Sequence, residues 1–238
     1  MKKHIFYVTK FTLFFSGFIL FGFLLIVSIV YGAPGDIERV SLDSAGGQGN
    51  DGSWHCSISS DGRFVAFGSD ATNLTPGDTN GVGDVFVKDR QTNAIERVSL
   101  DSAGVQGDNG SWHCSISSDG RFVAFGSDAT NLTVDINGVR DVFVKDRQTD
   151  AIEIVSLDSA GGQGNDGSWH CSISSNGRFV VFGSFATNLT PGDTNGFSDV
   201  FVKEIGGVAI PTLNEYGIMF LLLMLGSSAL KVLRRSNI

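Results

Sequence analysis

One stretch of sequence occurs three times in this chain with few changes, and it constrains the fold more than any other feature. The first and third copies, Val40–Lys88 and Val155–Lys203, each have 49 residues and differ at five positions. The middle copy, Val98–Lys145, is one residue shorter. Repeats of this length are typical of stacked supersecondary units, so fold and function are expected to be organised by repeat.

Each repeat has the pattern of a short antiparallel sheet. In the first copy, residues 53–59 alternate, which places Trp54, Cys56 and Ile58 on one face of a strand. A Ser-Asp-Gly turn follows, in which glycine supplies the positive φ. Further strands are expected at 63–67, 84–89 and 94–100, after a polar loop at 68–83 and a turn at 90–93. The pattern predicts an all-β fold with four strands per repeat.

The three cysteines lie at one position of the repeat, as Cys56, Cys114 and Cys171. Their place among alternating apolar residues predicts that each is a small buried side chain of the core. An odd number of cysteines in an exported protein leaves pairing between chains as the alternative.

The repeat also resembles a known family. Ser-Ile-Ser-Ser-Asp-Gly-Arg-Phe-Val-Ala-Phe, then Asn-Leu-Thr-Pro-Gly-Asp-Thr-Asn-Gly and Asp-Val-Phe-Val-Lys-Asp-Arg, are similar to the blades of TolB-like propellers, the PD40-type relatives of WD40 proteins. The resemblance implies a β-propeller-like array of three four-stranded antiparallel blades over residues 36–207. It does not imply a single activity, because this fold hosts many functions.

Three blades are fewer than the four to eight of closed propellers. The third copy ends near Glu204 without a fourth strand, while a spare fourth strand is expected at Ile37–Leu42, before the first blade. A three-blade ring would require each blade to turn by about 120°, far more than packed sheets usually do. We therefore expect a homodimer that completes a six-bladed ring, with an open three-blade arc as the alternative.

The N-terminal residues 1–33 have the pattern of a signal peptide or a signal anchor. Lys2, Lys3 and Lys10 precede a run without charge from Phe11 to Tyr31, and the small residues at 32 and 33 offer a cleavage site. The run is long enough to span a bilayer if it is not cleaved. In both cases the repeats are expected to be exported.

The C-terminal residues 208–238 combine a short motif, an apolar helix that is short for a membrane span but that local thinning of the bilayer can accommodate, and a basic end. They resemble the IPTL-type sorting signals that exosortases recognise in Gram-negative bacteria, with Tyr216 where the family usually has Trp. The matching positions are Ile210, Pro211, Thr212, Leu213, Tyr216, Gly217, Arg234 and Arg235. The resemblance implies an inner-membrane intermediate, cleavage by an exosortase-type membrane protease, and delivery to the cell surface, outer envelope or extracellular matrix. A plain membrane anchor is the alternative.

An Asp-x-Asn-Gly-x-x-Asp motif recurs in the loop before the third strand of each repeat. Its oxygen-bearing side chains are of the kind that Ca²⁺ binds, although the spacing is not that of an EF-hand. An Asn-Gly turn with Asx caps is the alternative. The candidate calcium ligands are Asp78, Asn80, Asp84, Asp135, Asn137, Asp141, Asp193, Asn195 and Asp199.

The histidines outside the leader, His55, His113 and His170, fall on the expected innermost strand of each blade. If the blades surround an axis, the three imidazoles are candidates for a transition-metal site. Hydrogen bonding of each ring to a neighbouring blade is the alternative.

The charge of the chain excludes one class of partner. A net charge of −8 argues against nucleic acid, which needs clustered Lys and Arg.

No Gly-x-Ser-x-Gly, His-Glu-x-x-His or phosphate-binding loop is present. The sequence therefore predicts a non-enzymatic surface protein that presents its loops to a glycan, a protein or Ca²⁺. The alternatives are a propeller hydrolase or lyase with a metal or histidine site in its central channel, and a truncated relic.

Overall fold

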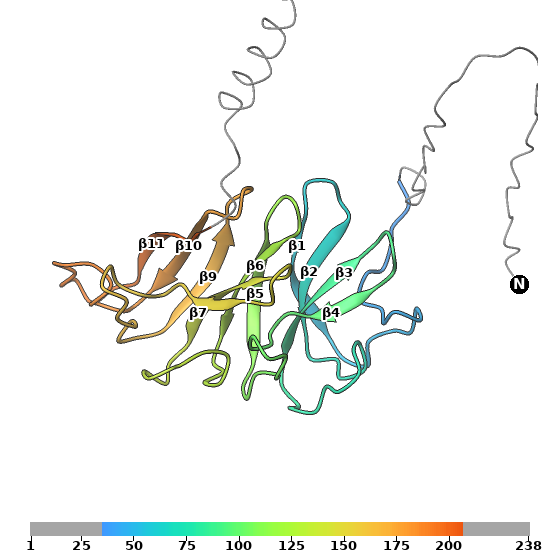
Figure 1. The fold of residues 1–238 in the computed structure, drawn as a ribbon, viewed down its shortest axis with the longest axis horizontal. Helices are drawn as coiled ribbons and strands as arrows, with labels where there is room; N and C mark the ends of the chain where they lie inside the picture. Colours follow the sequence, from blue (N-terminus) through green and yellow to red (C-terminus); the bar gives the residue numbers. More distant parts are fainter. Residues whose placement is uncertain (1–34, 207–238) are drawn as a thin grey trace, which may run out of the picture. The chain divides into compact units, whose positions relative to one another are not determined.

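The computed structural model describes residues 35–206, in which all eleven elements are β-strands. They form three antiparallel sheets that follow one another along the chain (Figure 1). The first sheet contains β1 (Ser53–Ile58), β2 (Phe64–Ser69), β3 (Asp84–Asp89) and β4 (Ile95–Arg97). The second contains β5 (Ser111–Ile116), β6 (Phe122–Ser127), β7 (Asp141–Asp146) and β8 (Ile152–Ile154). The third contains β9 (Ser168–Ile173), β10 (Phe179–Ser184) and β11 (Asp199–Glu204).

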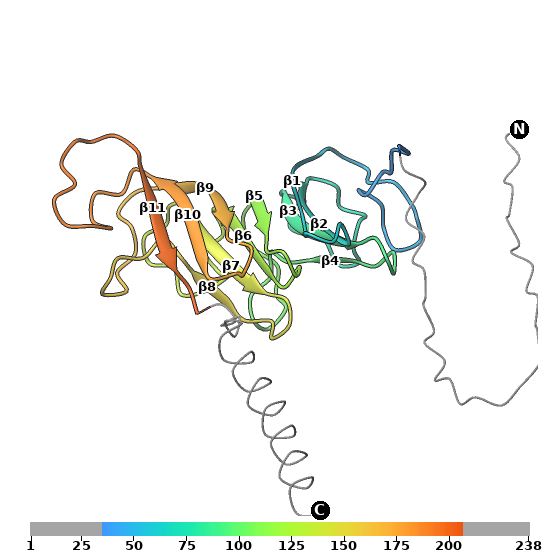
Figure 2. The ribbon, with the colours of Figure 1, turned by 90° about the horizontal axis from the view of Figure 1, so that it is seen from above.

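The strands of each sheet are paired in chain order, which is the meander of a propeller blade. The expected all-β fold and the division into one sheet per repeat are confirmed. The third sheet has three strands rather than four in the described part of the chain. The second sheet lies beside both the first and the third (Figure 2).

The spare strand expected at Ile37–Leu42 is not a strand in the described structure. Only Leu42 makes a β-bridge there, with Gln48. The equivalent segment of the next repeat, β4, pairs with β3. Because a strand needs a neighbour to hold its backbone hydrogen bonds, the segment at 37–41 stays extended without forming one.

The Ser-Asp-Gly turns form as expected, and their side chains fix them. The Asp61 carboxylate accepts hydrogen bonds from the Ser59 hydroxyl at 2.6 Å and from the Arg63 amide at 3.0 Å. Gly62 takes a φ of 72°, which favours a residue without a Cβ. The same contacts recur at the turns of the other two repeats.

A β-bulge interrupts the innermost strand of each sheet, which the alternating pattern did not predict. In β1 the register shifts between Trp54 and Ser57, and His55 inside the bulge has a φ of 52°. Trp54 consequently lies opposite Gly68, whereas Ile58 lies opposite Val65, so the two side chains point to opposite faces. The prediction that Trp54, Cys56 and Ile58 share one face was therefore wrong.

The apolar core lies between successive sheets. Val85 and Val87 of the first sheet pack in one cluster with Cys114 and Ile116 of the second. The equivalent residues of the second sheet pack in the same way on the third. Burial of both Cys114 and Cys171 confirms the core prediction for these two cysteines.

Cys56 is exposed, so the core prediction was wrong for the first repeat. Cys114 and Cys171 are covered by the preceding sheet, and their thiols donate to the backbone carbonyls of His55 and His113 at 2.9 and 3.0 Å. Cys56 lies in the first sheet, which has no preceding sheet in the described part of the chain.

The two terminal segments predicted to be membrane-directed, 1–33 and 208–238, lie outside the described residues. Between residues 35 and 206, the structure contains no helix with the length and hydrophobicity to cross a membrane.

Candidate functional site

The three Asp-x-Asn-Gly-x-x-Asp motifs, here called the rim motifs, end at the first residue of β3, β7 and β11. Each follows a loop that asparagine side chains hold. The Asn73 side-chain oxygen accepts from the Asn50 amide at 2.9 Å, and its amide group donates to the Gln48 carbonyl at 2.9 Å. Asn131 and Asn188 make the equivalent bonds. The three loops therefore share one anchoring scheme.

Within the rim motif of the first repeat, the asparagine acts as a turn residue. The side-chain oxygen of Asn80 accepts from the Val82 amide, while its amide group donates to the Gly107 carbonyl at 3.0 Å and to the Asp84 carboxylate at 3.3 Å. Gly81 follows with a φ of 69°. This is the Asx-capped Asn-Gly turn that the sequence offered as the alternative to a calcium loop.

An arginine lies between the two aspartates of the first rim motif. The Arg97 guanidinium is 3.5 Å from the Asp78 carboxylate and 3.4 Å from the Asp84 carboxylate, and all three side chains are buried. Burial raises the pKa of Asp84, whereas Arg97 and the Ser99 hydroxyl at 2.5 Å lower it. The sequence analysis missed Arg97, which supplies the positive charge that a metal ion would otherwise supply.

The second rim motif has no arginine, because Ile154 occupies the position of Arg97. Asn137 donates to the Asp141 carboxylate at 3.1 Å and Ser156 donates to it at 2.5 Å. Burial is the main cause that raises the pKa of Asp141, and the charge of Asp135 adds to it. The two carboxylates are thus brought near each other without a basic partner among these contacts.

The third rim motif is the most open. Asn195 donates to the Asp199 carboxylate at 3.3 Å, as in the other repeats. One oxygen of Asp193 is buried and has no hydrogen-bond partner within the described residues. Among the described residues, the Asn195 amide also has no backbone carbonyl partner of the kind that its equivalents find at Gly107 and Gly164.

The structure thus brings together the candidate calcium ligands of each repeat at the start of one strand. In all three motifs the asparagine directs its N–H group, rather than its oxygen, at the second aspartate. Between residues 35 and 206 no group of three or more His, Cys, Asp or Glu side chains has the arrangement of a metal site. Calcium binding by these loops stays a prediction.

The three histidines form a row along the innermost strands. The ring centroids of His55 and His113 are 4.0 Å apart, and those of His113 and His170 are 4.7 Å apart. Each histidine has a φ between 52° and 56°, inside its bulge. Burial, followed by the two flanking rings, lowers the pKa of His113 to about 4. The rings of neighbouring sheets therefore lie in contact, and their use as metal ligands stays a prediction.

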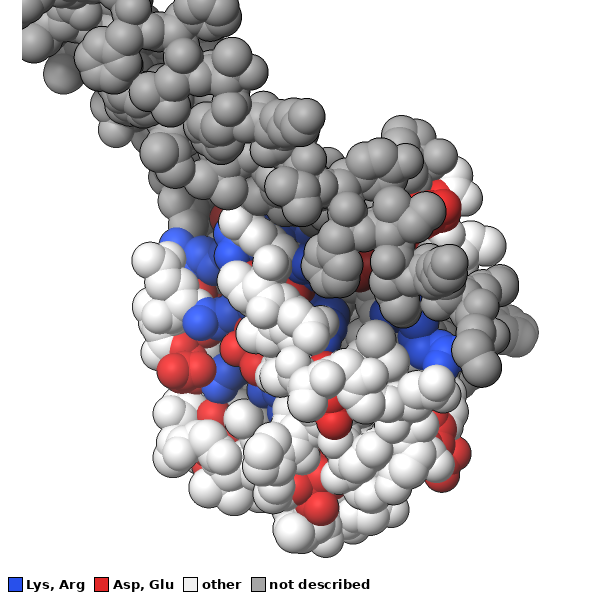
Figure 3. All heavy atoms as spheres, turned by 90° about the vertical axis from the view of Figure 1, so that its right-hand side faces the viewer, with Lys and Arg blue, Asp and Glu red and all other residues white. Residues whose placement is uncertain are grey.

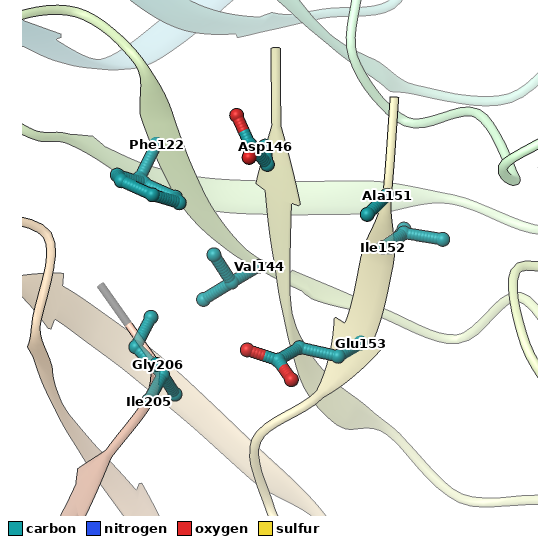
Figure 4. Close-up of a pocket in the computed structure, with 8 residues that line it drawn as sticks. All are labelled: Phe122, Val144, Asp146, Ala151, Ile152, Glu153, Ile205 and Gly206. Carbon is teal, nitrogen blue, oxygen red and sulfur yellow. The ribbon is translucent and has the colours of Figure 1, made fainter. Parts of the chain in front are cut away.

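Between the second and third sheets there is a hollow of about 290 Å³. Figure 4 shows the Glu153 carboxylate reaching into it toward Ile205 and Gly206. The equivalent hollow one repeat earlier is about 130 Å³, because Arg147 enters it and binds Glu96. Ile205 replaces that arginine in the third repeat, which leaves the larger hollow with a carboxylate inside.

One lysine joins each sheet to the loop before it, which the sequence analysis also missed; it is buried in the first two sheets and half-buried in the third. Lys145 donates to the carbonyl groups of Leu100, Asp101 and Asp150 at 2.8 to 3.3 Å. Burial lowers its pKa. Lys88 and Lys203 make equivalent bonds. The lysine of the Asp-Val-Phe-Val-Lys strand was the available signal, since a charge at the end of an apolar strand needs a polar partner.

The residues of the C-terminal sorting motif, from Ile210 to Arg235, lie outside the described part of the chain. The structure therefore describes the rim motifs and the histidine row but not the predicted sorting signal.

Comparison with known proteins gives a distant likeness of fold. No protein family matches the chain by sequence, and no curated protein matches it. Among solved structures, TolB from Acinetobacter baumannii is 17% identical with a TM-score of 0.41, over 66% of this chain and 30% of that protein. A protein described as TolB from Agrobacterium tumefaciens is 19% identical with a TM-score of 0.42, over 65% of this chain and 46% of that protein.

The β-propeller domain of the Trilobed protease from Pyrococcus furiosus is also similar, at 13% identity and a TM-score of 0.35, over 65% of this chain and 43% of that chain. The chain spans less than half the length of each of these proteins. Strand pairing within the chain itself, rather than these similarities, defines the propeller-like array.

Proposed function

We propose that this chain is an exported cell-envelope protein whose propeller-like body binds a polar ligand at the cell surface, without enzymatic activity. The observation that carries the proposal is the rim, where three copies of one polar loop are anchored in one way on successive sheets. Repeated, equally built loops suit a ligand that is itself repetitive, because several weak contacts to one polymer add up to firm binding. A surface glycan is such a ligand.

A groove beside the first rim motif is the place where we expect a glycan to bind. It has a volume of about 520 Å³. Leu74, Pro76 and Ile95 make its lining mostly apolar, and beside them lie the hydroxyl groups of Ser44, Thr72 and Thr75. Such groups pair with sugar hydroxyls, and the exposed backbone of Pro76 and Gly77 leaves room for a ring to approach.

Export and sorting rest on the terminal segments of the sequence. The basic start and apolar run of residues 1–33 suit export, and the Ile-Pro-Thr-Leu segment with its apolar helix and Arg234–Arg235 suits an exosortase-type protease. On this proposal the body passes through the inner membrane, is cleaved near Pro211–Leu213, and reaches the outer surface.

The experiment that tests export is the intact mass of the native protein in membrane and supernatant fractions. A species that lacks the leader and ends between Ile210 and Leu213, outside the inner membrane, is expected. A full-length C-terminus retained in the inner membrane would contradict the sorting step.

Glycan binding is tested on arrays with a variant that the chain itself supplies. The middle repeat carries Val134-Asp135 where the first has Pro76-Gly77-Asp78, so the shorter loop is known to fit the repeat. Replacing 76–78 by Val-Asp is expected to weaken glycan binding at the groove without unfolding the sheet. Equal binding by both proteins, or no binding by either, would contradict the proposal.

A second candidate function is a propeller-based hydrolase or lyase. The contact between the three histidine rings favours it, since burial keeps the His113 ring neutral near pH 7 and the neutral imidazole is the form that binds a metal ion. Turnover of a polysaccharide that disappears in His113→Asn would support this candidate, and no turnover by the wild-type chain would exclude it.

A further inference from the structure

Apolar side chains are exposed where the array of sheets ends. Of eleven large hydrophobic residues that are exposed in the described part, six belong to the third repeat and two, Ile37 and Ile58, belong to the N-terminal segment and β1. At four of the five positions where the first and third copies differ, the third copy has the larger side chain. These are Val181 for Ala66, Phe185 for Asp70, Phe197 for Val82 and Ser198 for Gly83. A surface that has gained two phenylalanines and a valine is typical of an interface.

The open face of the third sheet is the same face that the first and second sheets bury. Val200 is 78% exposed, whereas Val85 and Val142, at the same position of the repeat, are 0% exposed. In the first two sheets these valines pack on the innermost strand and the second strand of the following sheet. The exposed face of the third sheet is therefore shaped to pack on the innermost and second strands of another sheet of this repeat.

The first sheet exposes the complementary face, the one that a preceding sheet covers in the second and third sheets. Ile58 is 56% exposed, whereas its equivalents Ile116 and Ile173 are buried under the preceding sheet. Cys56 is exposed for the same reason. Figure 3 shows this side, on which Lys and Arg gather in the upper and central part while Asp and Glu are scattered among uncharged residues down to the lower edge.

The N-terminal segment is already held on the first sheet as β4 is held on the second. Lys88 donates to the carbonyl groups of Leu42 and Asp43, as Lys145 does to those of Leu100 and Asp101. Arg90 binds Glu38, as Arg147 binds Glu96. Unlike β4, the segment at 37–41 has no strand paired with it among the described residues.

A strand with an open edge exists at the other end of the array. β11 pairs with β10 alone in the described part of the chain, whereas its equivalents β3 and β7 pair on both sides. The equivalent pair, β3 and β4, sets the register: Phe86 lies opposite Arg97, and Lys88 opposite Ile95. Transferred by repeat, Phe201 would lie opposite Arg39, and Lys203 opposite Ile37.

We propose that a second copy of this chain occupies these ends, head to tail, with residues 37–39 of each copy pairing with β11 of the other. Two such contacts close a ring of six sheets, inside the range of four to eight blades in which propellers close. The other copy would thereby cover the apolar face of the third sheet, the face of the first sheet that carries Cys56 and Ile58, and the unpaired edge of β11.

At the third rim motif the second copy would add an ion pair and a hydrogen bond. Arg39 occupies the position of Arg97 in the repeat, is exposed, and would enter between Asp193 and Asp199 of the second copy as Arg97 does between Asp78 and Asp84. In the first rim motif Arg97 faces the Oδ2 atom of Asp78, so Arg39 would face the corresponding oxygen of Asp193. Asn195 would likewise find the Gly49 carbonyl of the second copy, because Asn80 and Asn137 bind the equivalent glycines.

Ring closure would also complete the histidine row. His55 of one copy would come next to His170 of the other, so that the row of three rings in contact becomes a ring of six around one axis. The thiol of Cys56 would donate to the His170 carbonyl of the second copy, as Cys114 and Cys171 donate to the equivalent carbonyls.

The first test is the mass of the full chain, extracted in mild detergent, by native mass spectrometry. We expect twice the mass of one chain, which is 25.3 kDa before any processing. Val200→Asp should weaken association by at least about 100-fold, because a charge would be buried without a partner. Ile136→Asp is the matched control, since Ile136 is equally exposed, at 82%, but lies in a loop of the middle repeat. One chain at tens of micromolar, an open series of larger assemblies, or equal association of both variants would overturn the proposal.

A charge exchange tests the register independently of the apolar face. Arg39→Asp alone should weaken association by about 30-fold or more, since it places a third carboxylate beside two others. The double variant Arg39→Asp with Asp193→Arg should restore most of the loss, while circular dichroism confirms that both variants are folded. Failure of the second change to restore association would overturn the proposed pairing of Arg39 with the third rim motif.

Discussion

One valine of the repeat, followed through its three copies, gives a test of how packing between sheets determines stability. Val85, Val142 and Val200 lie in the same local sequence, Asp-Val-Phe-Val-Lys, and each is the second residue of the equivalent strand, β3, β7 or β11. They differ in what covers them: the first two are 0% exposed and the third is 78% exposed. We therefore expect Val→Ala to be costly at 85 and 142 and nearly silent at 200 in the monomeric chain.

The size of the effect follows from the side chain removed. Two buried methyl groups contribute about 0.8 kcal/mol each by transfer, and the cavity left between sheets adds to this, which gives about 2–3 kcal/mol. For a domain of this size such a loss lowers the melting temperature by about 5–10 °C. Urea and thermal unfolding, followed by circular dichroism, measure both quantities.

The measurement has to be made below the concentration at which copies associate, where the open face of the third sheet stays open. Above that concentration, Val200→Ala should weaken association instead of the fold of one chain. Equal losses at all three positions in the dilute chain would refute the reasoning, because they would mean that intrinsic strand preference, rather than cover by the next sheet, decides the cost.

Three further predictions concern ionisation and backbone strain. Arg121 lowers the pKa of Asp146 to about 2, below its ordinary 3.8, so the pair stabilises the fold above about pH 4 and loses this contribution as the pH falls toward 2. Arg121→Met should lower the free energy of unfolding by about 1 kcal/mol at neutral pH. It should also make that free energy depend less on pH between 4 and 2, which urea unfolding at a series of pH values would show. His113 should titrate near pH 4 by NMR, and a midpoint near 6.5 would contradict the burial of its ring. At its φ of 56°, His113→Val should lose about 1–2 kcal/mol more than His113→Asn, since β-branched residues tolerate this backbone poorly; equal losses would speak against strain.

The strands could be predicted because local chemistry sets them. Glycine in the Ser-Asp-Gly turn and the apolar run at Asp84–Asp89 fix where strands start and stop, and the repeat confirms each boundary three times. The bulge at His55 could not be predicted in this way. One extra residue in one strand leaves the alternating pattern intact in sequence while it reverses the face of every side chain beyond it.

The environments of identical residues could not be read from their local sequence. Cys56, Cys114 and Cys171 lie in the same six residues, yet only the first is exposed, because cover comes from the sheet before it. The buried position of Arg97 between Asp78 and Asp84 was missed for a related reason: the ion pair joins β4 to the start of β3 across the sheet. The exchange of Arg97 for Ile154 between repeats was the available signal.

The reactivity of Cys56 in the unmodified chain tests most directly whether a second copy covers the exposed face of the first sheet. Cys114 and Cys171 are buried, and burial raises the pKa of the Cys171 thiol to about 12, so neither should react with an aromatic disulfide reagent while the protein is folded. We predict one fast thiol per chain in dilute protein and a progressively slower reaction of that thiol as concentration rises. One thiol that reacts at the same rate at every concentration would contradict head-to-tail closure.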